Sequence, residues 1–201
     1  MTFGRYVGNI SSRFDATELM AQLASVPQWL DAGQVLPLSD GHDQVLTSDL
    51  VMGGQTVSVA IKVFGRQSFF KDWFDRRNGS KAARSYYAGE FLYQKALGTA
   101  EPIAWLDRWD HGRLVESYYL CRHVAAPCFR DALIQIYDQE QNNAGMMALL
   151  EKVAPALRRL HAAGFMHGDL GNQNILVPKS SAGTYLEPLF IDLNRSQYSS
   201  A

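Results

Sequence analysis

Short apolar runs in the first part of the chain predict an antiparallel sheet. The clearest run covers residues 56–64, where apolar and polar residues alternate as they do in a half-buried strand. Earlier runs at residues 35–38 and 45–51 read in the same way, and Gly53-Gly54 predicts a hairpin turn before the third run. We therefore predict an antiparallel meander of three strands.

A short helix is predicted before this meander. Asp15 is a typical N-cap residue, and Glu18 stands where a capping box would have it reach back to the N-cap backbone. The helix ends at Pro27, and its apolar stripe consists of Leu19, Met20 and Leu23. Residues 3–14 show no regular period, and we expect them to be irregular.

Helical periods dominate the later part of the chain. Residues 80–97 predict a helix that stops at Gly98, and two strands at 103–109 and 116–124 predict a hairpin after it. An amphipathic helix follows at 129–137, and a further helix runs to His161, with Asn143 as its candidate N-cap. Pro155 falls inside that last helix. We expect a bend or a restart there, because proline removes a hydrogen bond and clashes with the preceding turn.

Composition limits the range of functions. The chain has 201 residues and a formal net charge of −1, so its overall charge gives no sign of nucleic-acid binding. We find no apolar leader segment and no stretch long enough to cross a bilayer, and we expect a cytoplasmic protein. Cys121 and Cys128 are expected to be free thiols, because their spacing with His123 matches no standard zinc pattern.

The main candidate for chemistry is the stretch from His167 to Asn174, which reads His-Gly-Asp-Leu-Gly-Asn-Gln-Asn. Asp169 and Asn174 have the spacing of a kinase catalytic loop, and an apolar strand at 190–191 leads into a second acid, Asp192. Phosphoryl transfer needs a carboxylate at the attacking hydroxyl and hard oxygen ligands for Mg²⁺. Each residue alone is an ordinary turn, cap or core residue. Their combination, order and flanking strands favour a kinase.

Upstream residues fit the same interpretation. Val59-Ala60-Ile61-Lys62 matches the strand on which kinases carry the lysine that contacts the nucleotide phosphates. Glu90, on the predicted helix, is the acid expected to pair with Lys62. Gly41 alone stands where a kinase has several glycines over the phosphates. A hinge at Arg122, His123 and Val124 would recognise adenine through backbone groups.

A basic and aromatic segment covers residues 66–84. Its basic residues include Arg66, Lys71, Arg76 and Arg77. They are interspersed with the aromatic residues Phe69, Phe70, Trp73 and Phe74. One interpretation is a solvated helix that packs its apolar side on the rest of the lobe. The other is a surface that contacts an anionic substrate or an anionic membrane.

The chain resembles the protein-kinase-like superfold, and within it the lipopolysaccharide kinase (Kdo/WaaP) family. Residues 80–84, 97–102 and 191–195 carry the closer resemblance, with Asn194 where protein kinases have the glycine of D-F-G. Gly168 replaces the arginine of H-R-D, as in many small-molecule phosphotransferases. The resemblance implies an α+β fold with an antiparallel-sheet N-lobe at 1–124. A mainly helical C-lobe would follow at 125–201, shortened because the chain ends at Ala201.

The resemblance also implies a reaction. The expected activity is transfer of phosphate from ATP, with Mg²⁺, to a sugar hydroxyl of the lipopolysaccharide inner core (Kdo or heptose). Asp169 would orient and deprotonate the hydroxyl, His167 would stabilise the loop, and Asn174 and Asp192 would hold the metal. Three alternatives stay open: a kinase of the aminoglycoside or choline type, an atypical protein kinase, and an inactive nucleotide-binding remnant.

Overall fold

The computed structural model describes residues 1–31, 36–39, 44–65, 75, 77–140 and 143–199. The chain forms two compact units. Unit 1 consists of residues 1–87 and 101–123, and unit 2 of residues 88–100 and 124–201. Unit 1 ends within one residue of the division expected at 124. Residues 88–100, which include Glu90, group with unit 2 instead of the N-lobe in which they were expected.

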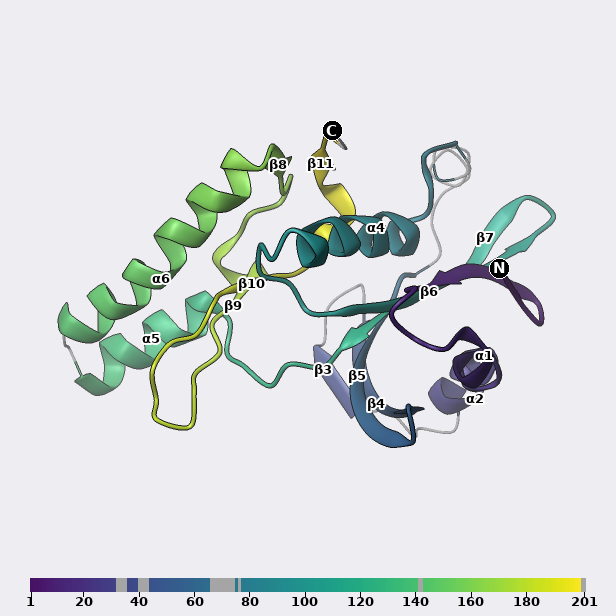
Figure 1. Ribbon diagram of the computed structural model, residues 1–201, viewed down its shortest axis with the longest axis horizontal. Helices are drawn as coiled ribbons and strands as arrows, with labels where there is room; N and C mark the ends of the chain where they lie inside the picture. The colour runs from purple at the N-terminus through teal and green to yellow at the C-terminus, as the bar shows by residue number, and fades with distance from the viewer. Residues whose placement is uncertain (32–35, 40–43, 66–74, 76, 141–142, 200–201) are drawn as a thin grey trace. The chain divides into compact units, whose positions relative to one another are not determined.

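Unit 1 is built on a seven-stranded antiparallel sheet (Figure 1). In spatial order its strands are β1 (Thr2–Phe3), β2 (Tyr6–Ile10), β6 (Pro102–Asp110), β7 (Arg113–Arg122), β5 (Gln55–Val63), β4 (Gln44–Met52) and β3 (Leu36–Ser39). The predicted meander corresponds to β3, β4 and β5, and the predicted hairpin to β6 and β7. The α+β expectation is confirmed.

The prediction that residues 3–14 are irregular is wrong for Phe3 and for residues 6–10, because β1 and β2 extend the sheet. Tyr6 and Ile10 are buried on one side of β2, and the strand pairs with β6 nearly a hundred residues later. Gly8 permits this pairing: a Cβ at this position would lie 2.0 Å from the backbone oxygen of Trp105. A short strand that contains glycine has little local sequence preference for a strand. It forms here because it can pair with the distant strand β6.

Two helices, α1 (Ala16–Ala24) and α2 (Val26–Asp31), follow β2. Asp15 caps α1 as predicted, since its carboxylate accepts from the Thr17 N–H at 2.8 Å. Glu18 does not complete the predicted capping box. It accepts instead from the Gly53 and Gly54 N–H groups, at 2.8 and 3.4 Å, and so fixes the β4–β5 turn to the helix.

The core of unit 1 lies between this helix pair and the sheet. Leu19 and Leu23 are fully buried in it, whereas Met20, predicted in the same stripe, is 39% exposed. Helical geometry turns successive side chains by about 100°, so Met20 leaves the face that Leu19 presents to the sheet. The other core side chains include Phe3, Leu50, Val59, Ile61, Ile103, Leu106 and Leu120.

The helix predicted at 80–97 is α4 (Lys81–Gln94). Ser80 begins it, with its hydroxyl accepting from the Ala83 N–H at 3.0 Å. It ends earlier than predicted because Ala96 and Gly98 take left-handed backbone conformations, with φ of 51° and 76°. Gly98 is needed there, since a Cβ would lie 2.2 Å from the carbonyl oxygen of Pro188.

Unit 2 contains the long helices α5 (Phe129–Glu140) and α6 (Asn143–Ala162), which lie side by side in Figure 1. The expected break at Pro155 does not occur: α6 is one helix of 20 residues. Pro155 and Glu151 are both exposed, so the carbonyl that loses its N–H partner can be hydrated by solvent. The buried face of α6 consists of Leu149, Val153, Ala156 and Leu160.

Short elements complete unit 2. They are β8 (Phe165–Met166), the 3₁₀ turn η1 (Asn172–Asn174), β9 (Ile175–Leu176), β10 (Leu189–Phe190), the 3₁₀ turn η2 (Leu193–Arg195) and β11 (Gln197–Tyr198). The rings of Phe91, Phe165 and Tyr198 pack together, with centroids 4.6 to 5.8 Å apart. This contact anchors β8 and β11 on the part of α4 that belongs to unit 2.

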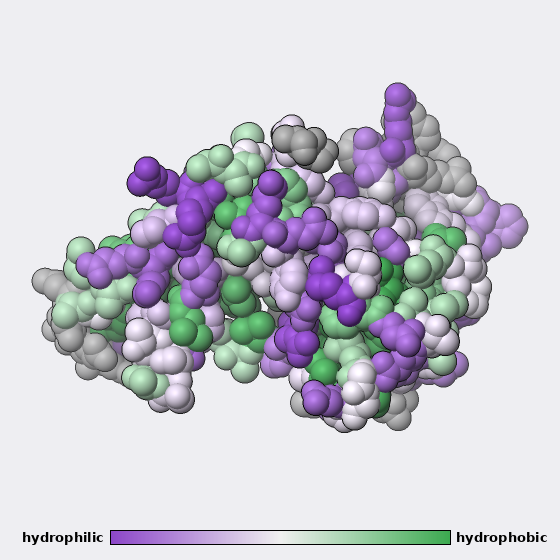
Figure 2. Space-filling model, in the orientation of Figure 1, coloured by the Kyte–Doolittle hydropathy of each residue, from purple (hydrophilic) through white to green (hydrophobic). Residues whose placement is uncertain are grey.

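Apolar side chains also reach the surface of α5 and α6. Ile134, Tyr137, Met147 and Leu150 are between 39% and 67% exposed. Figure 2 shows hydrophobic and hydrophilic surface intermixed over this part of the chain. Among the residues that the structure describes, no helix combines the length and the apolar character needed to cross a bilayer.

Candidate active site

Two loops of unit 2 carry the predicted chemical residues, and paired strands hold both loops at both ends. The first loop runs from β8 to β9, and the second connects β10 to β11. Met166 pairs with Gln197, and Ile175 pairs with Phe190. Because β8 pairs with β11 and β9 with β10, the two loops are fixed side by side.

Direct hydrogen bonds also join the loops. The buried His167 contacts the Ile191 carbonyl oxygen through Nε2 at 2.8 Å, and Ser196 Oγ donates to the His167 carbonyl at 3.3 Å. At the far end, the Ile191 N–H donates to the Asn174 carbonyl at 3.0 Å. His167 therefore bonds the first loop to the second through both its side chain and its backbone.

Gly168, in the first loop, lies close to the backbone of Arg195 in the second. Its φ is +75°, and a Cβ here would lie 2.3 Å from the carbonyl oxygen of Arg195. Both the backbone conformation and the space therefore require glycine. An arginine, which H-R-D kinases carry at this point, does not fit this backbone.

The loop after Gly168 is folded around the backbone of Asp169. The Asp169 carbonyl accepts from the Gly171 N–H at 2.9 Å and from the Asn174 side-chain amide at 2.8 Å. Asn174 is 8% exposed, so this bond fixes the orientation of a nearly buried side chain. With Nδ2 committed to Asp169, the Asn174 Oδ1 atom is directed away from that carbonyl.

Asp192, the second residue of the second loop, has a left-handed conformation, with φ of 61° and ψ of 51°. Asp and Asn tolerate this region better than other non-glycine residues do, although it still costs about 1 kcal/mol or more. The Asn194 amide donates to Asp192 Oδ1 at 2.5 Å and so orients the carboxylate. Such strained backbone is typical of functional sites.

Arg195 is a residue that the sequence analysis did not single out. Its Nη1 atom lies 3.3 Å from Asp169 Oδ2, and the two side chains are 68% and 46% exposed. Apart from the position of Arg195 in the stretch 191–195, no sequence pattern indicates this pair. The contact depends on the pairing of the two loops, which no local pattern predicts.

The oxygen atoms of Asn174 and Asp192 suit Mg²⁺, which prefers carboxylate and amide oxygens. In the described part of the chain, no group of three His, Cys, Asp or Glu side chains lies close enough to hold a metal. A Mg²⁺ ion at Asn174 and Asp192 would therefore need phosphate and water oxygens as further ligands, as Mg²⁺ in phosphoryl-transfer sites does.

Lys62 lies on β5 and is partly exposed, with Nζ 5.3 Å from the centroid of the Phe64 ring. Glu90 lies on α4 in unit 2, where the Gln94 amide donates to its carboxylate at 3.5 Å. Because the two residues belong to different units, their pairing remains a prediction. Gly41 lies outside the described residues.

At the predicted hinge, the chain passes from unit 1 to unit 2 between His123 and Val124. The Arg122 N–H donates to the Glu101 carbonyl at 2.8 Å, and the His123 N–H donates to the Ser58 carbonyl at 3.0 Å. Both amides are thus used inside unit 1, and the Val124 carbonyl accepts from the Ala126 N–H at 3.0 Å. The adenine contact at this hinge remains a prediction. Just before the hinge, burial raises the pKa of the Cys121 thiol to about 12. Cys121 is therefore a protonated, unreactive thiol at neutral pH.

The basic and aromatic segment is mostly outside the described residues, including Arg66, Lys71 and Arg76. Arg77 is exposed. Further along, Arg84 pairs with the buried Asp75 at 2.8 Å, so at least one cation of the segment has a structural role.

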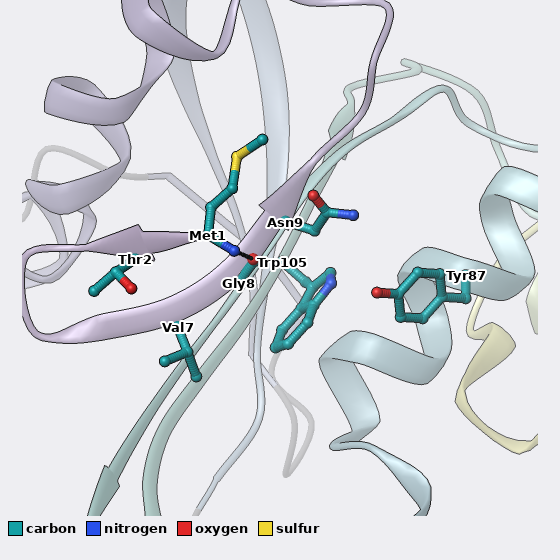
Figure 3. Close-up of a pocket in the computed structure, with 7 residues that line it drawn as sticks. All are labelled: Met1, Thr2, Val7, Gly8, Asn9, Tyr87 and Trp105. Atoms are coloured by element: carbon teal, nitrogen blue, oxygen red, sulfur yellow. Dashed lines mark hydrogen bonds between the residues drawn. The ribbon is translucent and has the colours of Figure 1, made fainter.

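A pocket of about 540 Å³ lies in unit 1 (Figure 3). Its lining comes from β1, β2, β6 and α4, and Figure 3 shows the Trp105 indole beside the Tyr87 phenol, with ring centroids 6.4 Å apart. Its other lining residues are Met1, Thr2, Val7, Gly8 and Asn9. None of the predicted site residues lines it.

The sequence of residues 67–201 matches the model of the lipopolysaccharide kinase (Kdo/WaaP) family. The range includes Glu90, Asp169, Asn174 and Asp192 but not Lys62. No curated protein matches the sequence.

Among solved structures, the chain is similar to one described as WaaP in complex with acyl carrier protein. The TM-score is 0.56 and the identity 20%, over 87% of this chain. The chain spans 66% of the length of that WaaP chain. The likeness confirms the predicted protein-kinase-like fold, and the family match covers well over half of the sequence. This chain therefore belongs to the lipopolysaccharide kinase (Kdo/WaaP) family.

Proposed function

We propose that the protein transfers phosphate from ATP to a sugar hydroxyl of the lipopolysaccharide inner core, on Kdo or heptose. The hydroxyl oxygen forms a bond to the γ-phosphorus, the bond from that phosphorus to the ADP oxygen breaks, and the hydroxyl proton passes to a carboxylate. The proposal is supported by the fixing of two loops to each other, because Asp169 and Asn174 lie on the first loop and Asp192 lies on the second.

Each residue of the two loops has a role in this proposal. Asp169 receives the hydroxyl proton and orients the nucleophile, since phosphoryl transfer depends mainly on positioning. Asn174 and Asp192 would hold Mg²⁺ through their side-chain oxygens. His167 links the loops and has a supporting role. When bound, Mg²⁺ and ATP supply the phosphoryl group and the positive charge that neutralises it.

The nucleotide contacts complete the proposal. Lys62 and Glu90 would orient the phosphates as an ion pair, and Gly41 would lie in the segment that covers them. The backbone of Val124 would meet the adenine, next to Arg122 and His123. We place the reaction in the cytoplasm, with peripheral contact to the inner membrane through the basic segment.

The test compares two variants at the two loops. Asp169→Asn should lower kcat by about 10²- to 10⁴-fold with little change in nucleotide affinity, because a base acts mainly in the transition state. Asp192→Asn should weaken Mg²⁺-ATP binding itself. Phosphate incorporation into purified inner-core lipopolysaccharide gives turnover, and titration calorimetry gives affinity. Asp138→Asn, at an exposed position of α5, is the control. Wild-type turnover in both site variants would contradict the assigned roles.

Other acceptors define the alternatives. Phosphorylation of an aminoglycoside or choline, but not of the lipopolysaccharide core, would indicate a small-molecule kinase, and autophosphorylation would indicate an atypical protein kinase. The close approach at Gly168 disfavours the protein kinase, because the arginine that senses a phosphorylated activation segment has no place there. ATP binding without any turnover would indicate a nucleotide-binding remnant.

A further inference from the structure

We propose that Arg195 is a positioning residue that holds the Asp169 carboxylate in the orientation needed to meet the acceptor hydroxyl. The inference rests on the proposed function and extends it to a residue outside the predicted base and metal ligands. The observation is the 3.3 Å contact between Arg195 Nη1 and Asp169 Oδ2, which joins the second loop to the first.

The backbone of Asp169 is fixed, but its side chain extends toward solvent. Gly171 and Asn174 both hold the Asp169 carbonyl, as described above. The carboxylate is 46% exposed and can rotate about two side-chain bonds. A base that rotates freely spends little time facing the acceptor, so a contact that selects one orientation increases the rate.

Arg195 is well placed to select that orientation because its own backbone is immobilised. Its carbonyl oxygen packs against Gly168, the residue before Asp169. The following residue, Ser196, donates through its N–H to Leu193 at 3.1 Å and through its hydroxyl to His167 at 3.3 Å. The guanidinium thus starts from a fixed point beside the base.

The chemistry of the pair supports positioning over proton transfer. A guanidinium remains charged at any working pH and only donates hydrogen bonds, so it cannot accept the hydroxyl proton. It contacts one carboxylate oxygen, Oδ2, and a carboxylate has a second oxygen that can face the hydroxyl. Arg195 would therefore act through Asp169 and not on the substrate.

The experiment measures kcat and KM for Arg195→Ala and Arg195→Lys. We expect kcat of Arg195→Ala to fall by about tenfold or more, but by less than the 10²- to 10⁴-fold expected for losing the base, with KM changed by less than about threefold. Arg195→Lys should recover part of the loss, and added guanidinium ion at millimolar concentration should rescue Arg195→Ala. In an Asp169→Asn background, Arg195→Ala should cause no further loss, because nothing remains to be positioned.

The matched control is Arg159→Ala. Arg159 forms an exposed ion pair with Glu187 in the same unit, with side-chain exposures of 48% and 46%, and should keep wild-type kcat. Wild-type kcat in Arg195→Ala, or an equal loss in the Asp169→Asn background, would overturn the inference.

A second measurement separates this inference from the proposed function. If the wild-type protein fails to phosphorylate lipopolysaccharide, the proposed function fails, and thermal unfolding of Arg195→Ala, Asp169→Asn and the double variant still tests the contact. Interacting side chains give Tm shifts that do not add, and the deviation should disappear in about 1 M salt. Additive shifts at low salt would contradict the contact itself.

Discussion

At the scale of single residues, two left-handed positions shape the candidate site. Gly168 is the second residue of the first loop and Asp192 the second residue of the second loop, with φ of 75° and 61°. Because Gly168 has no side chain, the Arg195 carbonyl can pack against it. Asp192, in contrast, carries a carboxylate that is a predicted metal ligand. From the sequence, Gly168 was visible as a departure from H-R-D, but the physical need for glycine was not.

Gly168→Ala should destabilise the protein and remove its activity. The new methyl group would overlap the Arg195 carbonyl, and the left-handed conformation adds about 1–2 kcal/mol. We expect a total loss of about 2–4 kcal/mol in the free energy of unfolding, measured by urea denaturation. Gly183→Ala is a close control, since Gly183 has a φ of 79° and open space around its Cβ direction. An equal loss of unfolding free energy in the two variants would show that the two loops can move apart at Gly168 without a cost in stability.

The predictable part of the site is its local part. Asp169 and Asn174 were predicted from their spacing of five residues in one loop, and the hydrogen bond from the Asn174 side-chain amide to the Asp169 carbonyl depends on that spacing. Asp192 was predicted from the strand before it. The pair between Arg195 and Asp169 could not be found, because it depends on two separate strand pairings that bring distant loops together.

At the scale of elements, strong local periods were predicted well and long-range pairings were not. Strands β4 and β5 are joined by a short turn, and the apolar runs at residues 45–51 and 56–64 predicted both ends of each strand to within one residue. Strand β2 was missed because its partner β6 is distant and Gly8 interrupts its pattern. Glu18 was predicted to cap its own helix, but its carboxylate accepts hydrogen bonds from the β4–β5 turn. Pro155 was expected to break a helix that solvent exposure allows to continue.

A buried acid connects three elements and makes stability depend on pH. Asp107 on β6 accepts a hydrogen bond from Ser117 on β7 at 2.7 Å and lies beside Ser80 at the start of α4. Burial raises the pKa of the Asp107 carboxyl from 3.8 to about 6, and the negative charge of Asp75 adds to this rise. As pH rises, the unfolded chain therefore loses the Asp107 proton at a lower pH than the folded protein does.

The sign of the effect follows from that difference. Between about pH 4 and pH 6 the folded state binds more protons at Asp107, so its contribution to stability decreases as pH rises, by about 2–3 kcal/mol in total. Asp107→Asn should remove this decrease, seen as a flatter curve of unfolding free energy against pH. Asp110→Asn, at an exposed residue on the same strand, should keep the wild-type slope. An unchanged slope in Asp107→Asn would show that Asp107 is ionised in the folded protein.

At the scale of the whole molecule, the expected nucleotide contacts are divided between the units. Lys62 belongs to unit 1, and Glu90 with all the loop residues belongs to unit 2. The order of these motifs along the chain was read from the sequence, and the chain passes from unit 1 to unit 2 between His123 and Val124. The sequence did not predict that residues 88–100 group with unit 2, because this depends on packing, such as the contact of Phe91 with Phe165 and Tyr198.

The basic and aromatic segment predicts weak binding to anionic membranes. Each lysine or arginine near such a surface contributes about 1 kcal/mol, and salt screens the attraction. Replacing Arg66, Lys71, Arg76 and Arg77 with serine should reduce co-sedimentation with phosphatidylglycerol vesicles at low salt. Serine at the exposed Arg130, Lys152, Arg158 and Arg159 should leave it unchanged. Vesicle binding equal in both variants would favour the alternative, in which the aromatic side chains only pack the segment on its lobe.

The hairpin between β9 and β10 has a practical consequence. Both strands hold the candidate site, yet the turn that joins them is closed by its own bonds, from Ser180 to Thr184 and from Gly183 to Ser180, each at 2.9 Å. Extra residues placed between Ala182 and Gly183 would lengthen an exposed tip without shifting the pairing of β9 with β10. A short peptide tag or a fluorescent reporter inserted there would allow the protein to be detected while leaving the two loops intact.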